Sequence, residues 1–366
     1  MFKEVNISAI PKVKSNKNID KRAVKAAGEF VKQSKLLIDK SYWAVKMFTS
    51  MNVFLWHLDA FAEKEDPVPM FVDIMHKAAK ALEAIRTSGV CGSHFPIEAR
   101  DSVNDKLFEE NVYGLFSDIW LGMTDDIYFD QSFEFTKERF LKNKIDPYQF
   151  FKDKIVLDAG CGSGKFSTAI ARFGAKKVIG LDIGEKGLEF ARKQAAKTDF
   201  ESILEYRSGS LLDMPFEDDY ADIVWSNGVV HHTLNYEKCI QEFSRVIKPG
   251  GSLFLYVNGR FGLFELLVDS LKQATSDVPR QHFQYFLTGL NINSGRIYWM
   301  LDCIYAPYEW KSRAEVIGLL KKYGFANMYQ FLRGVETDQI EQVTMGIPYA
   351  EAKYGEAQLK FIAEKV

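Results

Sequence analysis

Residues 156–166 read VLDAGCGSGKF. An apolar run ends in Asp158, glycines follow at positions 160, 162 and 164, and a helical segment begins directly after them. Glycine allows a sharp turn and a close approach of backbone N–H groups to a ligand, and the N-terminus of a helix favours negative charge. The segment therefore predicts a strand, a tight ligand-binding turn and a helix.

The alternation of strand and helix continues through the second half of the chain. Short apolar or β-branched runs alternate with helical segments, which predicts βαβ units on a parallel sheet. The predicted strands cover residues 155–158, 177–182, 203–206, 222–226 and 252–258, and the helices between them cover residues 165–173, 186–197 and 236–247. A further helix at residues 313–323 precedes two candidate last strands, residues 325–332 and 359–363.

Two other glycine motifs differ from this segment. A P-loop needs GxxxxGK[ST], but Ala159 stands where its first glycine belongs and Phe166 follows Lys165. The dinucleotide fingerprint GxGxxG has its third glycine one residue later than Gly164. In addition, the acid before the first glycine has no role in a pyrophosphate site. Neither motif explains the segment.

The segment instead resembles the first motif of the class I S-adenosylmethionine-dependent methyltransferases, DxGxGxG, at Asp158, Gly160, Gly162 and Gly164. Asp182 ends the next predicted strand, where an acid accepts hydrogen bonds from both ribose hydroxyls. The alternative is a structural glycine turn with a solvent-facing Asp182. The resemblance implies S-adenosylmethionine as cofactor, with S-adenosylhomocysteine as product. It also implies a Rossmann-like, mostly parallel seven-stranded sheet with helices on both faces.

Two further segments extend the resemblance. Residues 209–216, GSLLDMPF, look like the adenine-contacting turn of the family, and residues 243–251 match its helix-turn-strand before the fifth strand. Much of the family has a carboxylate where this chain has Ser210, so the adenine amine is met by Ser210, by a backbone carbonyl or by Asp213. The resemblance assigns these residues to the cofactor: Tyr128, Asp158, Gly160, Gly162, Gly164, Asp182, Ile183, Ser210, Leu211 and Asn227.

Residues 226–233, SNGVVHHT, bear on the class of methyl acceptor. They follow the fourth predicted strand at its carboxyl end, beside the ligand crevice of such a sheet. Enzymes that methylate exocyclic amines of nucleobases or glutamine usually show [DNS]PP[YF] here, and pyrimidine C5 enzymes need a Pro-Cys pair for their nucleophile. The chain has neither, and NGVVHHT is typical of methyltransferases that act on small metabolites. The resemblance therefore implies a small-molecule acceptor and makes nucleic acid unlikely.

His231 and His232 are the candidate catalytic residues. Methyl transfer is an in-line displacement at a sulfonium, so the protein mainly supplies proximity and alignment. An oxygen or amine acceptor must also lose a proton, and a histidine with a pKa near neutrality is the natural base. Because the two histidines are adjacent, at most one is expected to face the acceptor. Each can instead be a capping or packing residue, and a sulfur or carbanion acceptor needs no base.

The chain is expected to divide into three parts. They are an N-terminal helical domain (1–103), an aromatic-rich helical connector and active-site cover (104–153), and the methyltransferase domain (154–366). A long connection after the fifth strand, residues 259–310, should form a helical insertion that acts as an aromatic lid over the acceptor, or as an ordinary cover of the core. The first 40 residues carry a net charge of +6, which fits a basic arm or the solvated face of an amphipathic helix.

Composition limits the remaining functions. The chain has 366 residues, 47% of them hydrophobic and 26% charged, as in globular proteins, and its net charge of −2 gives no global field that would hold nucleic acid. The four cysteines and six histidines follow no disulfide or metal-ligand spacing, so no metal is expected. We find no signal peptide and no membrane-spanning run, which favours a cytoplasmic protein. A homodimer is a further expectation.

Three functions are compatible with these features. The first is S-adenosylmethionine-dependent methyl transfer to a small-molecule metabolite. The second is methylation of RNA or protein, with the N-terminal helical region binding the macromolecule. The third is a non-enzymatic member that holds the cofactor without turnover. RNA that stays bound through purification would favour the second function, and formation of S-adenosylhomocysteine would exclude the third.

Overall fold

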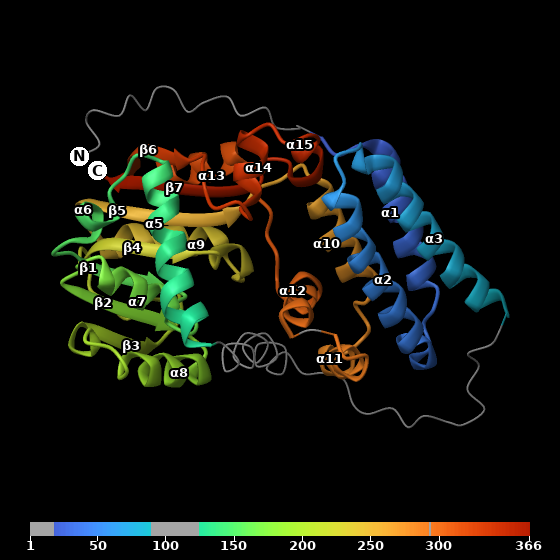
Figure 1. Cartoon of the computed structure of the whole chain (residues 1–366), viewed down its shortest axis with the longest axis horizontal. Coiled ribbons are helices and arrows are strands. Elements are labelled where there is room, and N and C mark those ends of the chain that lie inside the picture. Colours follow the sequence, from blue (N-terminus) through green and yellow to red (C-terminus); the bar gives the residue numbers. More distant parts are fainter. Residues whose placement is uncertain (1–17, 89–123, 293) are drawn as a thin grey trace.

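Seven strands form one sheet in residues 18–88, 124–292 and 294–366, the part of the chain that the computed structural model describes (Figure 1). The strand order is β3-β2-β1-β4-β5-β7-β6. Strands β1 to β5 run parallel, and β7 lies antiparallel between β5 and β6. The strands are β1 Ile155–Ala159, β2 Lys177–Asp182, β3 Leu204–Ser208, β4 Ala221–Asn227, β5 Ile247–Asn258, β6 Phe325–Phe331 and β7 Gln358–Lys365.

Helices flank the sheet and form a second group beside it (Figure 1). Those on the sheet are α5 Ser132–Lys142, α6 Pro147–Phe151, α7 Lys165–Arg172, α8 Glu185–Ala195, α9 Tyr236–Val246 and α13 Arg313–Lys322. Those beside it are α1 Lys21–Lys35, α2 Trp43–Ala62, α3 Pro67–Ser88, α10 Leu263–Ala274, α11 Arg280–Gly289 and α12 Ser294–Tyr305. The short helices α14 Gln339–Thr344 and α15 Ala350–Tyr354 connect β6 to β7.

The sheet is buried on both faces because successive side chains of a strand point to opposite sides. In β1, Val156 packs with Phe140 of α5 and Ile170 of α7, in one hydrophobic cluster. Its neighbour Leu157 belongs to a second cluster, together with Phe243 of α9. Parallel strands buried on both faces read as nearly continuous apolar runs, which is the pattern that the sequence shows.

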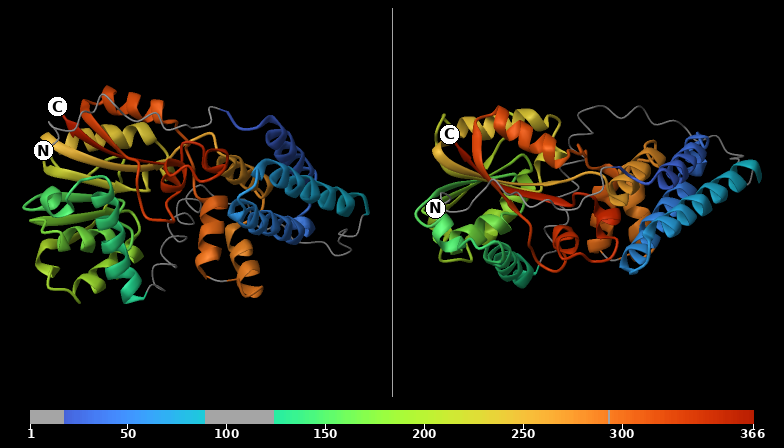
Figure 2. Two further views of the ribbon diagram at one scale, coloured as in Figure 1. Left: turned by 45° about the horizontal axis from the view of Figure 1, so that its top comes forward. Right: turned by 90° about the horizontal axis from the view of Figure 1, so that it is seen from above.

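The N-terminal helices and the insertion share a hydrophobic core. Phe30 of α1, Phe54 of α2 and Phe71 of α3 pack in the same buried cluster as Leu267 of α10 and Leu301 of α12. Both views of Figure 2 place these two segments side by side, although they are far apart in the sequence. They form one helical unit, and the carboxyl ends of β4 and β5 point toward it (Figure 1).

The predicted mostly parallel seven-stranded sheet with helices on both faces is confirmed, as are the N-terminal helices and the helical insertion after the fifth strand. The predicted third strand began too early, because residues 201–203 form a 3-10 turn before β3. The predicted fifth strand began too late, since β5 starts at Ile247. Residues 104–123 of the predicted connector lie outside the described residues, and the three-part division of the chain stays a prediction.

Candidate active site

The glycine turn follows β1 and requires residues without a side chain. Gly160, Gly162 and Gly164 all have positive φ, of 82°, 54° and 79°. A Cβ on Gly160 would lie 2.5 Å from Cγ1 of Val229, so the turn and the segment after β4 approach each other more closely than a side chain permits. A Cβ on Gly164 would lie 2.7 Å from the hydroxyl of Tyr206. The spacing of the three glycines therefore fixes both the turn and its packing.

Asp182 ends β2 and ties this strand to the glycine turn. Its Oδ2 accepts a hydrogen bond from the Gly162 backbone N–H at 2.9 Å, and its Oδ1 accepts one from the Gly184 N–H at 2.8 Å. Burial raises the pKa of Asp182, while these backbone hydrogen bonds lower it. A carboxylate has roughly four lone-pair sites, so Asp182 keeps acceptor capacity for hydroxyl groups of a ligand.

Two of the predicted cofactor residues support the turn from behind. Asp158 is 2% exposed and accepts a hydrogen bond from the Ser167 hydroxyl at 2.6 Å. Burial raises the pKa of Asp158 to about 7. Tyr128 is fully buried, and its hydroxyl donates to the Ser163 carbonyl at 2.8 Å. Tyr128 therefore holds the backbone of the turn, and Asp158 connects the end of β1 to α7.

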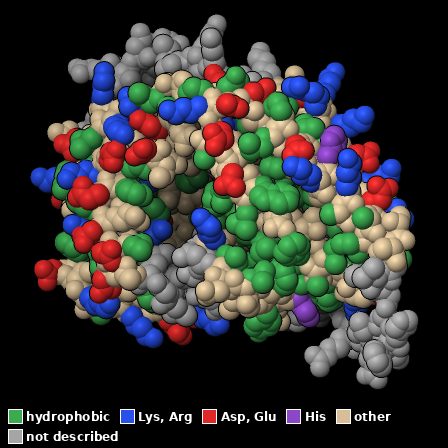
Figure 3. All heavy atoms as spheres, turned by 45° about the vertical axis from the view of Figure 1, so that its right-hand side comes forward, with side chains coloured by type: hydrophobic (Ala, Val, Ile, Leu, Met, Phe, Trp, Pro, Cys, Tyr) green, Lys and Arg blue, Asp and Glu red, His purple; other side chains and the backbone are tan. Residues whose placement is uncertain are grey.

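A cavity of about 550 Å³ lies at the carboxyl ends of the strands, the position at which open α/β sheets bind ligands. Its wall includes nine of the predicted site residues: Gly160, Gly162, Asp182, Ile183, Ser210, Leu211, Asn227, His231 and His232. The other three, Tyr128, Asp158 and Gly164, are not in the wall, and their contact with the cofactor stays a prediction. The space-filling view shows the surface hollowed beside a group of hydrophobic side chains (Figure 3).

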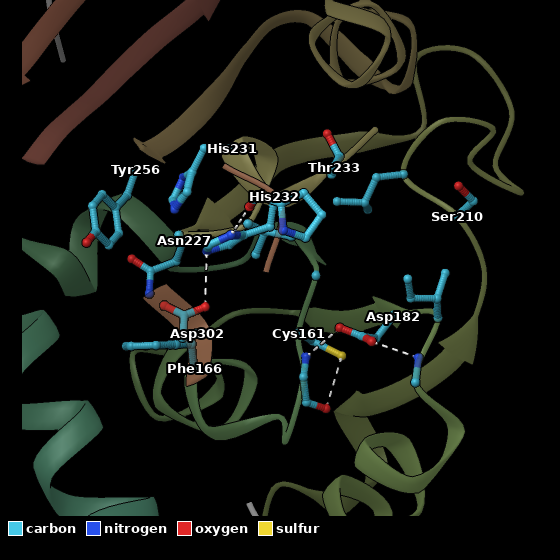
Figure 4. A pocket seen from close by; sticks show the side chains of 18 of the residues that line it. Cys161, Phe166, Asp182, Ser210, Asn227, His231, His232, Thr233, Tyr256 and Asp302 are labelled. Atoms are coloured by element: carbon cyan, nitrogen blue, oxygen red, sulfur yellow. Dashed lines mark hydrogen bonds and ion pairs between the residues drawn. The ribbon is translucent and has the colours of Figure 1, made fainter. Parts of the chain in front are cut away.

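The cavity has two chemically different ends. Figure 4 shows Asp182 and Ser210 on one side of it, and Tyr256, His231 and Asp302 toward the other. The Asp182 end comes from the glycine turn and the segments after β2 and β3. Ile183 is 44% exposed there, so it offers an apolar surface to a ligand. The opposite end combines aromatic rings with titratable groups.

His232 has a defined tautomer. Its Nδ1 lies 2.7 Å from the Pro307 carbonyl oxygen. A carbonyl only accepts, so Nδ1 donates and the lone pair is on Nε2. Nε2 lies 3.9 Å from Oδ1 of Asp302. Burial lowers the pKa of His232, whereas the charge of Asp302 and the hydrogen bond to Pro307 raise it. The net direction is downward, which favours the neutral imidazole.

His231 is held differently. Its side chain is buried, and its Nε2 lies 3.5 Å from the Asn258 amide nitrogen. Within the described ranges, its Nδ1 has no hydrogen-bond partner. The Asn258 amide also donates to the Tyr308 hydroxyl at 2.9 Å. Burial and the neighbouring charge of His232 lower the pKa of His231 well below its ordinary value. His231 therefore packs in the wall behind His232.

Asp302 was missed by the sequence prediction. It lies on α12, and burial raises the pKa of its carboxyl group, while His232 and Lys272 lower it. Its Oδ1 is buried and has no hydrogen-bond partner among the described residues. The sequence contains no signal for this position, because an isolated acid in a helical insertion has no characteristic spacing. The other missed side chains of this end are Arg139, Lys165, Phe166, Tyr256, Asn258 and Tyr308.

Within the described ranges, no three His, Cys, Asp or Glu side chains stand close enough together to hold a metal ion. Within the same ranges, every helix is too short or too polar to cross a bilayer. Cys161, Cys239 and Cys303 are buried and form no disulfide bond. Cys91 lies outside the described residues.

Comparisons with known proteins agree with this geometry. A family model described as a methyltransferase domain matches residues 157–255. A malonyl-[acyl-carrier protein] O-methyltransferase of Yersinia pestis is 34% identical over 135 residues, which are 36% of this chain and 48% of that protein. The 24-methylenesterol C-methyltransferase 2 of Arabidopsis thaliana is 29% identical over 166 residues, which are 44% of this chain and 45% of that protein.

One solved structure aligns with most of this chain. The geranyl diphosphate C-methyltransferase from Streptomyces coelicolor aligns at 15% identity with a TM-score of 0.39, over 74% of this chain and 86% of that one. The chain spans less than half the length of the two curated relatives. The matched segment runs from β1 to β5 and includes the glycine turn, Asp182 and both histidines.

The matched model and the sheet order show that the chain carries the methyltransferase domain of the class I, S-adenosylmethionine-dependent family. Methyltransferases of this class use S-adenosylmethionine as methyl donor and release S-adenosylhomocysteine. The residues present fit this cofactor. Gly160 and Gly162 line the cavity without a side chain, Asp182 has acceptor capacity for ribose hydroxyls, and Ile183 offers an apolar surface for the adenine.

Proposed function

We propose that the chain transfers a methyl group from S-adenosylmethionine to a small-molecule acceptor. The observation that carries this proposal is the single cavity that joins the Asp182 end to the His232 and Asp302 end. In-line displacement requires donor and acceptor to share one enclosed space with the reacting atoms aligned. When bound, the cofactor supplies a methyl group activated by its sulfonium. The residues of the protein bind and orient the donor and the acceptor, and one of them accepts the proton that the acceptor loses.

His232 is the base in this proposal. Its Nδ1–H donates to the Pro307 carbonyl, so Nε2 is the ring nitrogen that would take a proton from the acceptor. The lowered pKa keeps the imidazole neutral at physiological pH. Protonation of Nε2 would place the new positive charge 3.9 Å from Asp302, which favours it. Asp302 thus acts as a positioning residue that stabilises the charged imidazole.

His231 is a packing residue in this proposal. It is more buried than His232 and contacts Asn258 rather than the carboxylate of Asp302. Its ring centroid lies 4.1 Å from that of His232, so it restricts the orientation of the neighbouring ring. The adjacent histidines therefore have different tasks, one chemical and one structural.

The position of the helical unit favours a small-molecule acceptor. Asp302 comes from α12, and Pro307 and Tyr308 follow this helix directly, so the insertion supplies part of the cavity wall. The N-terminal helices pack against α10 and share its hydrophobic core. A face used for packing is not free to bind a macromolecule. We therefore favour a metabolite over RNA or protein as the acceptor.

A labelling experiment tests the proposal. The purified chain is incubated with methyl-labelled S-adenosylmethionine and, separately, with a metabolite extract, total RNA and denatured protein. We expect label in a small organic product, in amounts that match the S-adenosylhomocysteine formed. Asp182→Ala provides the negative control. Label in RNA or protein would show that the acceptor is a macromolecule and not a metabolite. Cofactor binding without turnover in any of the three fractions would favour a non-enzymatic role.

Two expectations about the whole protein also stay predictions. A homodimer should elute at twice the mass of the chain in size-exclusion chromatography with light scattering. A cytoplasmic location should appear in cell fractionation.

A further inference from the structure

Lys165 places a basic side chain in the cavity wall. It begins α7, directly after the glycine turn, and lines the cavity with its neighbour Phe166. Its ammonium nitrogen lies 5.2 Å from the centroid of the Phe166 ring. Across the described part of the chain, the ion pairs include none that involves Lys165. Burial lowers the pKa of Lys165, and so does the charge of Arg139.

Arg139 adds a second cation to the same wall. It projects from α5 and donates two hydrogen bonds to Asp338, both of 2.8 Å. The same carboxylate also accepts a hydrogen bond of 2.7 Å from the ammonium of Lys360. The single carboxylate of Asp338 therefore pairs with two cations, Arg139 and Lys360. Lys360 is almost completely buried, and its pKa falls to about 8 through burial and the charge of Arg139.

Asp302, a carboxylate on α12 that also lines the cavity, does not neutralise this cluster. The cations that act on Asp302 are His232 and Lys272, and neither Lys165 nor Arg139 is among them. The Lys165 side therefore keeps an excess of positive charge. Water and salt ions stabilise the charge of an exposed lysine. A partly buried lysine needs an anionic partner, or it loses its proton.

We propose that Lys165, with Arg139 beside it, binds an anionic group of the methyl acceptor, a carboxylate or a phosphate. This inference rests on the proposed function, because it names the class of acceptor for the same cavity. The remaining wall of this end is aromatic, with Phe166, Tyr256 and Tyr308. The acceptor is therefore an organic anion with an apolar body. The anion pairs with Lys165, and the apolar body lies against the rings.

Lys165 stands three residues after Gly162, beside the glycine turn that is bound to Asp182. From there the cationic cluster extends through Arg139 toward Lys360 and β5. The ring of Tyr256 lies 5.1 Å from the Lys360 ammonium, which connects the cationic cluster to β5. Asp182 is on β2, and β1 and β4 separate these two strands in the sheet. Neighbouring strands are about 4.8 Å apart, so the two ends are separated by roughly 14 Å. An anion at the β5 side therefore belongs to a different group from the ribose at Asp182.

A charge-matched pair of probes tests the proposal by binding. Isothermal titration, with the cavity saturated by S-adenosylhomocysteine, compares phenylacetate, phenyl phosphate and the neutral phenylacetamide. We expect at least one of the two anions to bind about tenfold or more tightly than the amide, the scale of one hydrogen bond to a charged group. The preferred anion tells a carboxylate from a phosphate. Lys165→Met should abolish the preference, and Lys165→Arg should retain most of it.

Lys176→Met is the matched control, because Lys176 is an exposed lysine just before β2 that does not line the cavity. It should keep the full preference. Equal binding of anions and amide by the wild-type chain would overturn the proposal, as would an unchanged preference in Lys165→Met.

A third measurement separates the acceptor from the cofactor, which has a carboxylate of its own. If Lys165→Met weakens S-adenosylhomocysteine but not 5′-methylthioadenosine, which lacks that carboxylate, Lys165 serves the cofactor and the proposal is overturned. Equal affinity of Lys165→Met and wild type for both nucleosides supports an acceptor role. A wild-type chain that binds neither nucleoside would contradict the proposed function itself, which keeps the two failures distinct.

Discussion

The two ends of the cavity are built in different ways. The Asp182 end, which we propose binds the cofactor, comes mainly from one continuous stretch, residues 155–184, in which strand, turn, helix and strand follow each other. The opposite end, which we propose binds the acceptor, shares with this stretch only the start of α7. It is otherwise assembled from α5, the turn after β4, β5 and α12, which are far apart in the sequence. A compact end is fixed by local backbone geometry. A dispersed end depends on the packing of the helical unit against the sheet.

The largest effect is expected from a substitution in the glycine turn of the compact end. Gly160→Val should lower the affinity for S-adenosylhomocysteine by about 100-fold or more, because positive-φ strain and overpacking each cost on the order of 1–3 kcal/mol. The new side chain would collide with Val229. Calorimetry measures the loss. Gly174→Val is the control, since Gly174 also has positive φ, 90°, but an open environment. Loss of binding in both variants would point to general unfolding instead.

The second-largest effect is expected from a substitution of the proposed base in the dispersed end. His232→Ala should lower kcat by ~10² to 10⁴, the usual contribution of a positioned base, with cofactor affinity nearly unchanged. His231→Ala should have a much smaller effect on kcat. Because the pKa of His232 is lowered, the wild-type rate should stay level from pH 8 to pH 7 and fall only as acid protonates the imidazole. Equal rates in wild type and both variants would mean that the acceptor needs no base.

A moderate effect tests the ribose carboxylate. Asp182→Ala should weaken cofactor binding by about 1.5–3 kcal/mol, the scale of a hydrogen bond to a charged group. It also removes the acceptor of the Gly162 and Gly184 N–H groups, so the turn should loosen. Asp182→Asn, which keeps an acceptor oxygen, should lose less. Calorimetric affinities equal to wild type in both variants would refute the assignment of Asp182.

The smallest effect concerns the adenine side. The Ser210 hydroxyl oxygen already accepts a hydrogen bond from the Leu212 backbone N–H at 3.1 Å. Ser210→Ala should therefore change the affinity for S-adenosylhomocysteine by no more than about fivefold, within the range of one neutral hydrogen bond. A larger loss in the same titration would show that Ser210 binds the adenine amine directly.

The local geometry of the compact end could be predicted from the sequence for a physical reason, while the binding of the cofactor by these residues stays a prediction. Positive φ at alternate positions demands glycine, so the turn leaves a visible spacing, and Asp182 follows at the end of the next strand. Asp158 was recognised from the same motif, but its burial beneath the turn depends on Ser167, which no spacing reveals. Periodicity also predicted the order of strands and helices, while their limits shifted by a few residues because turns and bulges depend on packing.

The dispersed end was predicted only in part. The pair His231 and His232 was found because it follows a strand at its carboxyl end, but the sequence could not tell the two apart. Their difference depends on Pro307 and Asp302, which come from the insertion. The charge imbalance at Lys165 was likewise hidden, since it requires knowing which carboxylates Arg139 and Lys360 share. Such features depend on contacts between segments far apart in the sequence, which no local sequence pattern predicts.

The most direct test of the account is a crystal structure of the chain with S-adenosylhomocysteine. We expect both ribose hydroxyls on the Asp182 carboxylate and the thioether sulfur directed toward His232 and Asp302, with the space beside Lys165 left open for the acceptor. A ligand bound outside this cavity, or one bound within it with its sulfur turned away from His232, would contradict the central claim that one cavity brings the methyl donor and the base together.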